Sequence, residues 1–259
     1  MYKKIVCTFL LMTLILCGCG KKKYETTLQA AIDRKKLIIG VRVDAKPFGF
    51  IGKDGYNYGL DVDLGSYIAR ALLNKYDNAV EYVPVTAQNR ISVLNAGKVD
   101  MLIAAMSITD NRKKIMDFSV PYYEAGQAVM VQYWSKIQSL KELDGKRVII
   151  VYGSTGEGSV RRALPSATVI GYKNYDKAVA ALKAGEAEAI IADDSVLLPY
   201  VYDDKTLKLL PGRYSVEPYA IAFRKGKESQ KLREFVDFFL MDYAQSGKLI
   251  KLQQKWGVR

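Results

Sequence analysis

The stretch at residues 100–123, DMLIAAMSITDNRKKIMDFSVPYY, decides how the rest of the chain is interpreted. It opens with a short apolar run at 101–106, which predicts a buried strand. Hydroxyl and turn residues follow, and Thr109 is suited to cap a helix that carries Arg112 in its first turn. A strand end beside a helix N-terminus directs N–H groups, a hydroxyl and a guanidinium to one point, which favours a bound carboxylate. The alternative is that Arg112 merely begins a solvated Arg-Lys-Lys run.

The same stretch carries a family resemblance. Ser-Ile-Thr-x-x-Arg at 107–112, followed by Asp-Phe-Ser-Val-Pro-Tyr at 117–122, resembles the signature of polar amino-acid solute-binding proteins of ABC importers, the bacterial extracellular solute-binding proteins of family 3. Most of the chain follows the same pattern. The resemblance implies that Arg112 clamps the α-carboxylate of a bound amino acid with help from Ser107. It also implies that the carbonyl of Ala105, where relatives often have Gly, faces the α-ammonium group.

The composition excludes several other functions. The chain has 259 residues, 49% of them hydrophobic and 25% charged, which is typical of a soluble globular protein of one large or two small domains. It contains no histidine, so it has no Ser-His or Cys-His nucleophile pair and no His-rich metal site. We therefore expect no enzyme, no metal and no cofactor.

The beginning of the chain is typical of a lipoprotein signal peptide, at residues 1–18. Its apolar part at 5–16 is too short to span a membrane as a helix. Leu-Cys-Gly-Cys at 16–19 resembles a bacterial lipobox, and cleavage after the glycine would leave Cys19 as the lipid-bearing residue. The alternatives are cleavage before Cys17, where no small residue precedes the cut, and an uncleaved membrane anchor. Cleavage after the glycine would remove Cys7 and Cys17 with the leader, so we expect no disulfide in the mature domain.

A lipid-anchored tether is expected at residues 19–27, and it starts with a Lys-Lys-Lys run at 21–23 that could lie close to anionic headgroups. The whole chain carries a formal charge of +12, a balance that nucleic-acid-binding proteins also show. The other basic residues are scattered and interrupted by acids. We therefore expect an extracytoplasmic protein anchored to the cell membrane, with no nucleic-acid partner.

Two more arginines bear on the ligand. Arg42 ends a predicted strand at 37–43, and Arg90 lies early in a helix that follows a predicted strand at 80–85. The run Thr-x-x-Asn-Arg-Ile at 86–91 resembles the acidic amino-acid branch of the family, which implies that both arginines contact a side-chain carboxylate. Three arginines in one pocket repel one another unless carboxylates neutralise them, which favours glutamate or aspartate.

The alternative is a neutral polar ligand such as glutamine or cystine. The resemblance implies that relatives with neutral ligands also carry arginine at these positions. In this alternative, Arg42 and Arg90 bond Asp44 and Asp61. Leu60 stands where the family often has an aromatic residue that stacks on cationic ligands, so its identity disfavours lysine, arginine or histidine as ligand.

The second half of the chain supplies the opposite side of the pocket. A Gly-rich loop at 153–159 follows a predicted strand at 147–152 but lacks the phosphate-loop pattern. The resemblance implies that Thr155 bonds the α-carboxylate, that Tyr175 contacts the ligand and that Asp193 accepts from the α-ammonium group. A buried carboxylate needs a cation, which supports the role of Asp193. A plain tight turn is the alternative for the loop.

These expectations combine into a two-lobed α/β protein with the type II periplasmic-binding-protein fold and a two-strand hinge. Lobe 1 is expected at 28–127 and 221–259, and lobe 2 at 128–220, each with a mostly parallel sheet. We expect a monomer that traps an acidic or polar amino acid between closing lobes and delivers it to a membrane permease. The alternatives are a cyclohexadienyl-dehydratase-like enzyme, in which a glutamate is expected where Asp193 stands, and a sensory or adhesive lipoprotein.

Overall fold

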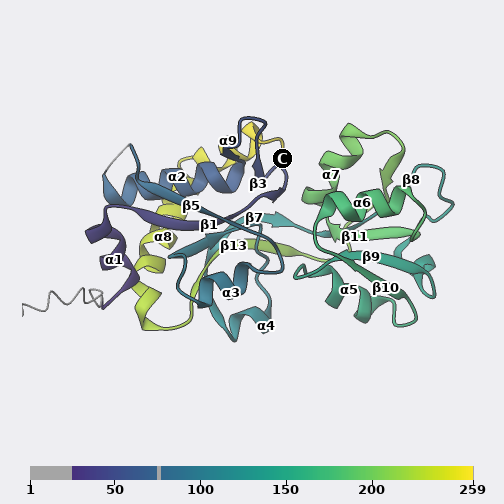
Figure 1. Cartoon of the computed structure of the whole chain (residues 1–259), viewed down its shortest axis with the longest axis horizontal. Helices are drawn as coiled ribbons and strands as arrows, with labels where there is room; N and C mark the ends of the chain where they lie inside the picture. Colours follow the sequence, from purple (N-terminus) through teal and green to yellow (C-terminus); the bar gives the residue numbers. More distant parts are fainter. Residues whose placement is uncertain (1–24, 75–76, 259) are drawn as a thin grey trace, which may run out of the picture.

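The computed structural model describes residues 25–74 and 77–258. The expected signal peptide, Cys19 and most of the expected tether lie outside the described residues. Figure 1 shows two lobes side by side, connected by extended segments of the chain. Each lobe has one five-stranded sheet with helices on both faces, so the expected two-lobed α/β architecture is confirmed.

Lobe 1 contains a sheet of strand order β5-β1-β6-β13-β7. Strand β1 is parallel to β5 and β6, whereas β13 is antiparallel to β6 and β7. The strands are β1 (Leu37–Arg42), β5 (Val80–Val85), β6 (Met101–Ile103), β7 (Met116–Ala125) and β13 (Glu217–Arg224).

Lobe 2 contains a sheet of order β10-β9-β11-β8-β12. Strand β9 is parallel to β10 and β11, and β8 is antiparallel to β11 and β12. In each sheet four strands therefore point in one direction, as expected of mostly parallel sheets, and the strand that enters from the other lobe, β13 or β8, runs against them. The strands are β8 (Gln127–Gln132), β9 (Arg147–Val151), β10 (Thr168–Tyr172), β11 (Ala189–Asp193) and β12 (Leu207–Leu209).

A small third sheet, β2-β3-β4, follows the end of β1 and lies beside the gap between the lobes. Its strands are β2 (Asp44–Ala45), β3 (Gly49–Ile51) and β4 (Asn57–Tyr58). Ala45 is fully buried and belongs to an apolar cluster whose other members come from lobe 2. The lobes therefore touch each other here.

Helices cover both faces of each sheet (Figure 1). In lobe 1 they are α1 (Thr27–Arg34), α2 (Leu60–Leu73), α3 (Arg90–Asn95), α4 (Asp110–Lys113), α8 (Lys227–Gln245) and α9 (Lys248–Lys255). In lobe 2 they are the 3-10 helix η1 (Leu140–Leu143), α5 (Gly156–Ala163), α6 (Tyr175–Lys183) and α7 (Asp194–Asp203). Within the described residues, none of these helices combines the length and the apolar run that crossing a membrane needs.

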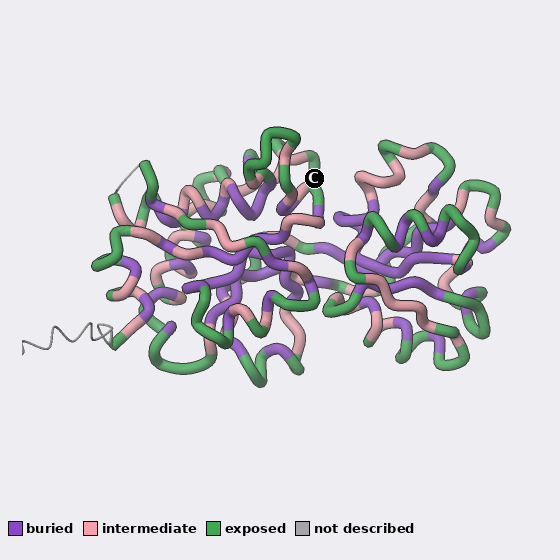
Figure 2. The backbone as a smooth tube through the Cα atoms, viewed as in Figure 1, coloured by how far each residue is buried: buried purple, intermediate pink, exposed green. Residues whose placement is uncertain are grey.

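The central strands are buried on both faces, as Figure 2 shows for each lobe. Successive side chains of a strand point to opposite faces, so one strand contributes to two cores. In β9, Ile149 and Val151 pack in a cluster with α6 and α7, while Val148 and Ile150 pack in another with α5. Burial on both faces explains why these strands are continuous apolar runs in the sequence.

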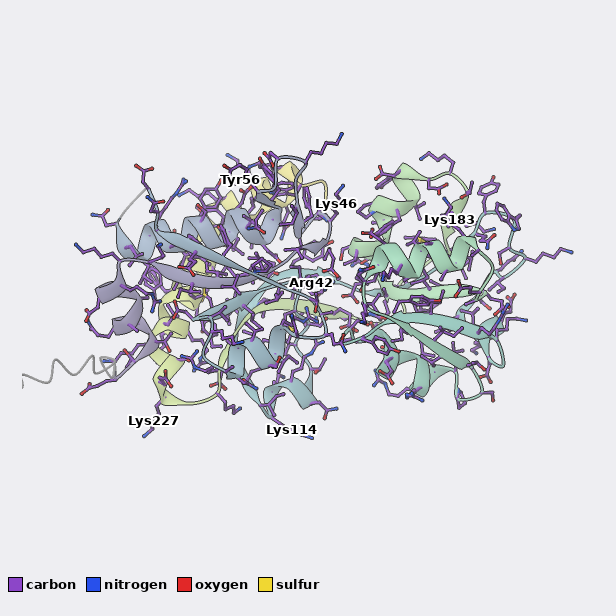
Figure 3. All side chains as sticks on the ribbon, viewed as in Figure 1. Arg42, Lys46, Tyr56, Lys114, Lys183 and Lys227 are labelled. Carbon is purple, nitrogen blue, oxygen red and sulfur yellow. The ribbon has the colours of Figure 1, made fainter. Side chains whose placement is uncertain are left out.

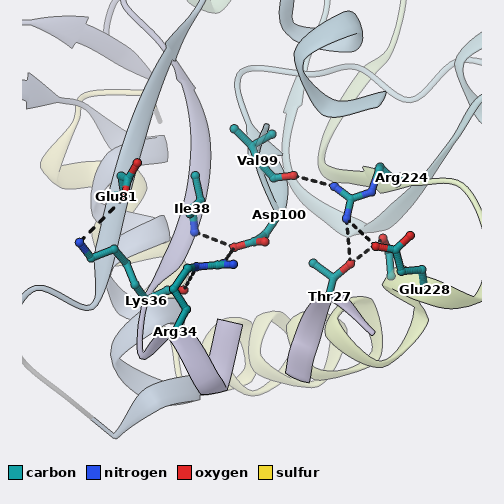
Figure 4. Close-up of polar contacts among 10 residues, drawn as sticks. Thr27, Arg34, Lys36, Ile38, Glu81, Val99, Asp100, Arg224 and Glu228 are labelled. Atoms are coloured by element: carbon teal, nitrogen blue, oxygen red, sulfur yellow. Dashed lines mark hydrogen bonds and ion pairs between the residues drawn. The ribbon is translucent and has the colours of Figure 1, made fainter. Parts of the chain in front are cut away.

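Polar contacts fix the first described helix to lobe 1 (Figure 4). The guanidinium of Arg34 at the end of α1 donates to Asp100 at 2.5 Å, and the same carboxylate accepts from the backbone of Ile38 at 2.7 Å. Arg224 donates to the hydroxyl of Thr27 at 3.1 Å. Helix α1 thus begins inside the stretch expected to be tether, at the end of lobe 1 away from lobe 2.

Candidate functional site

A cavity lies between the lobes, at the carboxyl ends of β1 and β11 and beside the start of α5. The cavity is small, with a volume of about 10 Å³. Seven of the eight predicted ligand-binding residues line it, with three residues that the sequence did not single out. The predicted residues are Arg42, Arg90, Ala105, Ser107, Thr155, Tyr175 and Asp193, and the additional ones are Ser154, Val196 and Tyr219.

The eighth predicted residue, Arg112, does not line the cavity, but it bonds the backbone of Ser107, which does. Thr109 caps its helix as predicted, because the hydroxyl accepts from the Arg112 N–H at 3.3 Å. The Arg112 guanidinium is buried and donates to the carbonyl of Ser107 at 2.8 Å and to the carbonyl of Gly153, in lobe 2, at 3.0 Å. Burial lowers the pKa of Arg112, and the carboxylates of Asp193 and Glu217 oppose this change.

Arg90 is the first residue of α3, and its guanidinium is fixed mainly by backbone carbonyls. Nη1 donates to the carbonyls of Ala104 and Ala105 at 2.5 and 3.0 Å, and Nη2 donates to the carbonyl of Gly153 at 3.2 Å. Burial, followed by repulsion from Arg112 and Arg42, holds its pKa well below the usual value. Its Nε is buried and has no hydrogen-bond partner among the described residues.

Arg42 ends β1 and forms an ion pair with Asp44, in which Nε lies 2.6 Å from Oδ1. The guanidinium carbon is 5.8 Å from the ring centre of Tyr175 in lobe 2. Figure 3 shows Arg42 inside the molecule near the junction of the lobes, whereas Lys114 and Lys227 point outwards. The pair leaves two buried atoms, Arg42 Nη2 and Asp44 Oδ2, with no partner in the described part of the chain.

Ala105 adopts a left-handed conformation, with φ of +45°, which explains why relatives often have Gly there. This turn ends the strand at Ile103, three residues earlier than the apolar run predicts. The Ala105 N–H donates to the fully buried carboxylate of Asp61 at 2.8 Å, and Tyr122 donates to the same carboxylate at 2.8 Å. Burial raises the pKa of Asp61 to about 6. The Asp61 carboxylate therefore accepts hydrogen bonds from the Ala105 N–H and from Tyr122, and not from Arg90.

Asp193 ends β11 on the lobe 2 side of the cavity. Tyr219 donates to its Oδ2 at 2.5 Å, and the side-chain amide of Gln127 donates to Oδ1. The same amide donates to the hydroxyl of Thr155 at 3.0 Å. Burial raises the pKa of Asp193 to about 6, although the Tyr219 hydrogen bond acts in the opposite direction.

Two polar residues near the cavity, Tyr219 and Gln127, were not predicted from the sequence to take part in the site. Tyr219 and Gln127 lie on the strands that cross between the lobes and were given only a structural role. Since these strands pass beside the cavity, polar side chains on them were the available signal. Leu60 lies in the lobe 1 core, fully buried, and is not among the residues that line the cavity.

The geometry is suited to recognition of a zwitterion. Buried guanidiniums on the lobe 1 side attract an anionic group, and the carboxylate of Asp193 on the lobe 2 side attracts a cationic group. In residues 25–74 and 77–258, no group of three or more acidic or cysteine side chains is placed to hold a metal ion.

Comparisons with known proteins agree with this geometry. The family model of the bacterial extracellular solute-binding proteins, family 3, matches residues 37–259. The chain is 33% identical to the ABC transporter glutamine-binding protein GlnH of Bacillus subtilis, over 97% of this chain and 94% of that protein. It is 37% identical to a glutamine-binding protein of Geobacillus stearothermophilus, over 80% and 81%. Among solved structures, it resembles an ancestral arginine-binding protein bound to arginine, with a TM-score of 0.80, 37% identity and coverage of 86% and 99%.

Proposed function

The chain belongs to the bacterial extracellular solute-binding proteins of family 3, and from this membership we propose that it captures a polar amino acid, glutamine foremost, and delivers it to the permease of an ABC importer. The cavity between the lobes is the binding site in this proposal. The relatives named as glutamine-binding proteins support the choice of ligand.

The α-amino-acid group would be held by both lobes. In this proposal Arg112 and the hydroxyls of Ser107 and Thr155 donate to the α-carboxylate. Ser107 and Thr155 line the cavity, and Arg112 bonds the carbonyl of Ser107. Asp193 is placed to accept from the α-ammonium group, since it is a buried carboxylate with no basic side chain bonded to it in the described residues. A charge-assisted pair on each end of the ligand accounts for recognition of any α-amino acid.

The Arg42–Asp44 pair is the observation that carries the choice of glutamine. It leaves one buried donor, Nη2 of Arg42, and one buried acceptor, Oδ2 of Asp44, without partners in the described chain. A carboxamide has one carbonyl to accept from the first and one NH₂ group to donate to the second. Leaving such groups unpaired is costly, so a ligand that satisfies both is favoured. Arg42 lines the cavity, and Asp44 lines the groove next to it.

The balance of charges supports the same choice. Three buried guanidiniums, of Arg42, Arg90 and Arg112, already face at least as many buried or nearly buried carboxylates, those of Asp44, Asp61, Asp193 and Glu217. A zwitterion with a neutral side chain keeps this balance. A second ligand carboxylate would add a negative charge with no free counter-charge, which is costly in a desolvated site.

An acidic ligand, glutamate or aspartate, is the second candidate. The unpartnered Nε of Arg90 and Nη2 of Arg42 favour it, because a carboxylate accepts from both more strongly than an amide does. It would have to approach Asp44 Oδ2, and repulsion there is the reason that we place it second.

We propose that the lobes move about the two connections near Ala125–Gln127 and Glu217. Domain closure around a ligand usually concentrates at a few such residues. In this proposal lobe 1 is formed by 28–127 and 221–259 and lobe 2 by 128–220, the protein acts as a monomer, and a lipid on Cys19 anchors it outside the cytoplasm. Mass spectrometry of the mature N-terminus should find Cys19 acylated; acylation of Cys17, or an unmodified terminus, would exclude this anchor.

We also propose that the protein is not an enzyme. The dehydratase alternative needs a general acid in the cavity, and Asp193 is the available carboxyl group. Incubation with a cyclohexadienyl acid should release no ultraviolet-absorbing product, and release of one would favour the dehydratase.

Thermal unfolding in the presence of each of the twenty amino acids tests the ligand. A ligand at one hundred times its Kd stabilises the folded state by about 2.7 kcal/mol, which raises Tm by roughly 5–10 °C for a chain of this size. We expect the largest rise with glutamine. A larger rise with arginine would mean that the acidic groove at Asp44, Asp176 and Asp203 holds the ligand side chain.

A further inference from the structure

The loop between β9 and α5 inserts a backbone carbonyl of lobe 2 between two arginines of lobe 1. The carbonyl of Gly153 accepts from Nη2 of Arg90 at 3.2 Å and from Nη2 of Arg112 at 3.0 Å. One acceptor thus serves two buried guanidiniums that repel each other. These two hydrogen bonds cross from one lobe to the other without involving any ligand atom.

Gly153 also fits tightly against the backbone of lobe 1. Its φ is +77°, and a Cβ at this position would lie 2.3 Å from the carbonyl oxygen of Ala87 and 2.8 Å from Cα of Gln88. Both atoms belong to backbone, so no side chain can turn aside to make room. The lobes would have to separate by about 1 Å to restore an ordinary contact. Only a glycine allows the approach that the structure shows.

We propose that Gly153 is an interlobe latch, a positioning residue whose carbonyl holds the lobes together through Arg90 and Arg112. As a statement about ligand affinity, this rests on the proposed function. The same arginines that are placed near the ligand are satisfied from lobe 2 only when the lobes are closed. Closure therefore stabilises the charged groups of lobe 1 independently of the ligand and adds to the affinity for it.

The chain offers a matched control in Gly185, in the same lobe. Its φ is +79°, almost equal to that of Gly153, but a Cβ there has no atom within 4 Å in the described structure. Gly153→Ala and Gly185→Ala introduce the same kind of backbone strain, so Gly185→Ala measures the effect of that strain alone. Only Gly153→Ala places an atom against the other lobe.

Two measurements on the wild type and both variants test the latch. Small-angle X-ray scattering without ligand should give a larger radius of gyration for Gly153→Ala than for the wild type and Gly185→Ala. Calorimetric titration with glutamine should give a Kd at least tenfold weaker for Gly153→Ala and within twofold of the wild type for Gly185→Ala.

The outcomes separate the latch from the proposed ligand. The latch is supported if Gly153→Ala has a larger radius of gyration than Gly185→Ala, or if it binds glutamine with a weaker Kd. If the two variants coincide in both, the latch is rejected, even if the wild type binds glutamine. A wild type that binds no amino acid would reject the proposed function, while the scattering comparison would still decide on the latch.

Discussion

The two walls of the cavity differ in charge and in the way their polar groups are held. Lobe 1 supplies three buried guanidiniums, two of which are held by backbone carbonyls and one by a carboxylate. Lobe 2 supplies Asp193, which is held by the side chains of Gln127 and Tyr219 on the crossing strands. In the proposed binding mode, the negative end of an amino acid is directed to lobe 1 and its positive end to lobe 2.

Under the proposed function, this difference would allow one ligand to draw the two lobes together. Neither wall alone satisfies both charged ends of a zwitterion, so full binding requires both lobes. The wall of lobe 1 is set by backbone geometry, whereas the carboxylate of lobe 2 depends on strands that connect the lobes. Substitutions on the two walls should therefore weaken binding by different routes.

Removal of the lobe 1 anion site should have the largest effect. We expect Arg112→Ala to weaken binding of every amino acid by about 2–5 kcal/mol, the cost of truncating one side of a buried charge pair. Calorimetry with glutamine and glutamate measures this loss. Arg161→Ala is the control, because that side chain is 66% exposed and bonds only Glu157 in the described residues. A loss of a few tenths of a kcal/mol for Arg112→Ala would mean that the anion site lies elsewhere.

Titration of the lobe 2 wall should have the next largest effect. Only ionised Asp193 attracts the α-ammonium group, and burial places its pKa at about 6. As the pH falls from 7 to 5 the carboxylate becomes protonated, so the apparent Kd should rise by about tenfold. The charges of glutamine itself do not change in this range.

Asp193→Asn should bind more weakly at pH 7 and lose most of this pH dependence. An equally steep dependence in the variant would assign the titration to another group, with Asp61 the first candidate because burial raises its pKa to about 6 as well.

The smallest effect should come from the backbone of the lobe 1 wall. Ala105 has φ of +45°, and a left-handed conformation costs a residue other than glycine roughly 1–2 kcal/mol. Replacing Ala105 by glycine would remove this cost and stabilise the folded state. The greater flexibility of glycine in the unfolded chain offsets part of that stabilisation. We expect Ala105→Gly to raise the free energy of unfolding by up to about 1 kcal/mol, measured by urea denaturation, with glutamine affinity unchanged. A fall in stability would show that the surrounding hydrogen bonds, rather than Ala105 itself, relieve the strain.

The sequence predicted the strands well where burial on both faces makes an apolar run. The predicted strand at 147–152 is observed as Arg147–Val151, and the one at 37–43 is observed as Leu37–Arg42. The directions of β8 and β13 were not predicted, because strand direction depends on how the chain crosses between lobes and leaves no local pattern.

The residues of the cavity were predicted more completely than their partners. Residues at strand ends are brought together by the fold, which is why the resemblance carried over to the cavity lining. The partners of Arg90 depend on the left-handed turn at Ala105 and on Gly153, 63 positions away in the sequence. Such contacts depend on one backbone angle and on how closely the lobes approach. Neither can be predicted from the types of residue or from their spacing.

The most direct test of the account is competition between glutamine and glutamate in the wild type and in Asp44→Asn. We expect the wild type to bind glutamine at least about tenfold more tightly, because the Asp44 carboxylate accepts from an amide and repels a carboxylate at close range. In Asp44→Asn the repulsion is lost, so the preference should move towards glutamate by a similar factor. Equal affinities in the wild type, or a preference for glutamate that Asp44→Asn leaves unchanged, would contradict the proposed role of the Arg42–Asp44 pair.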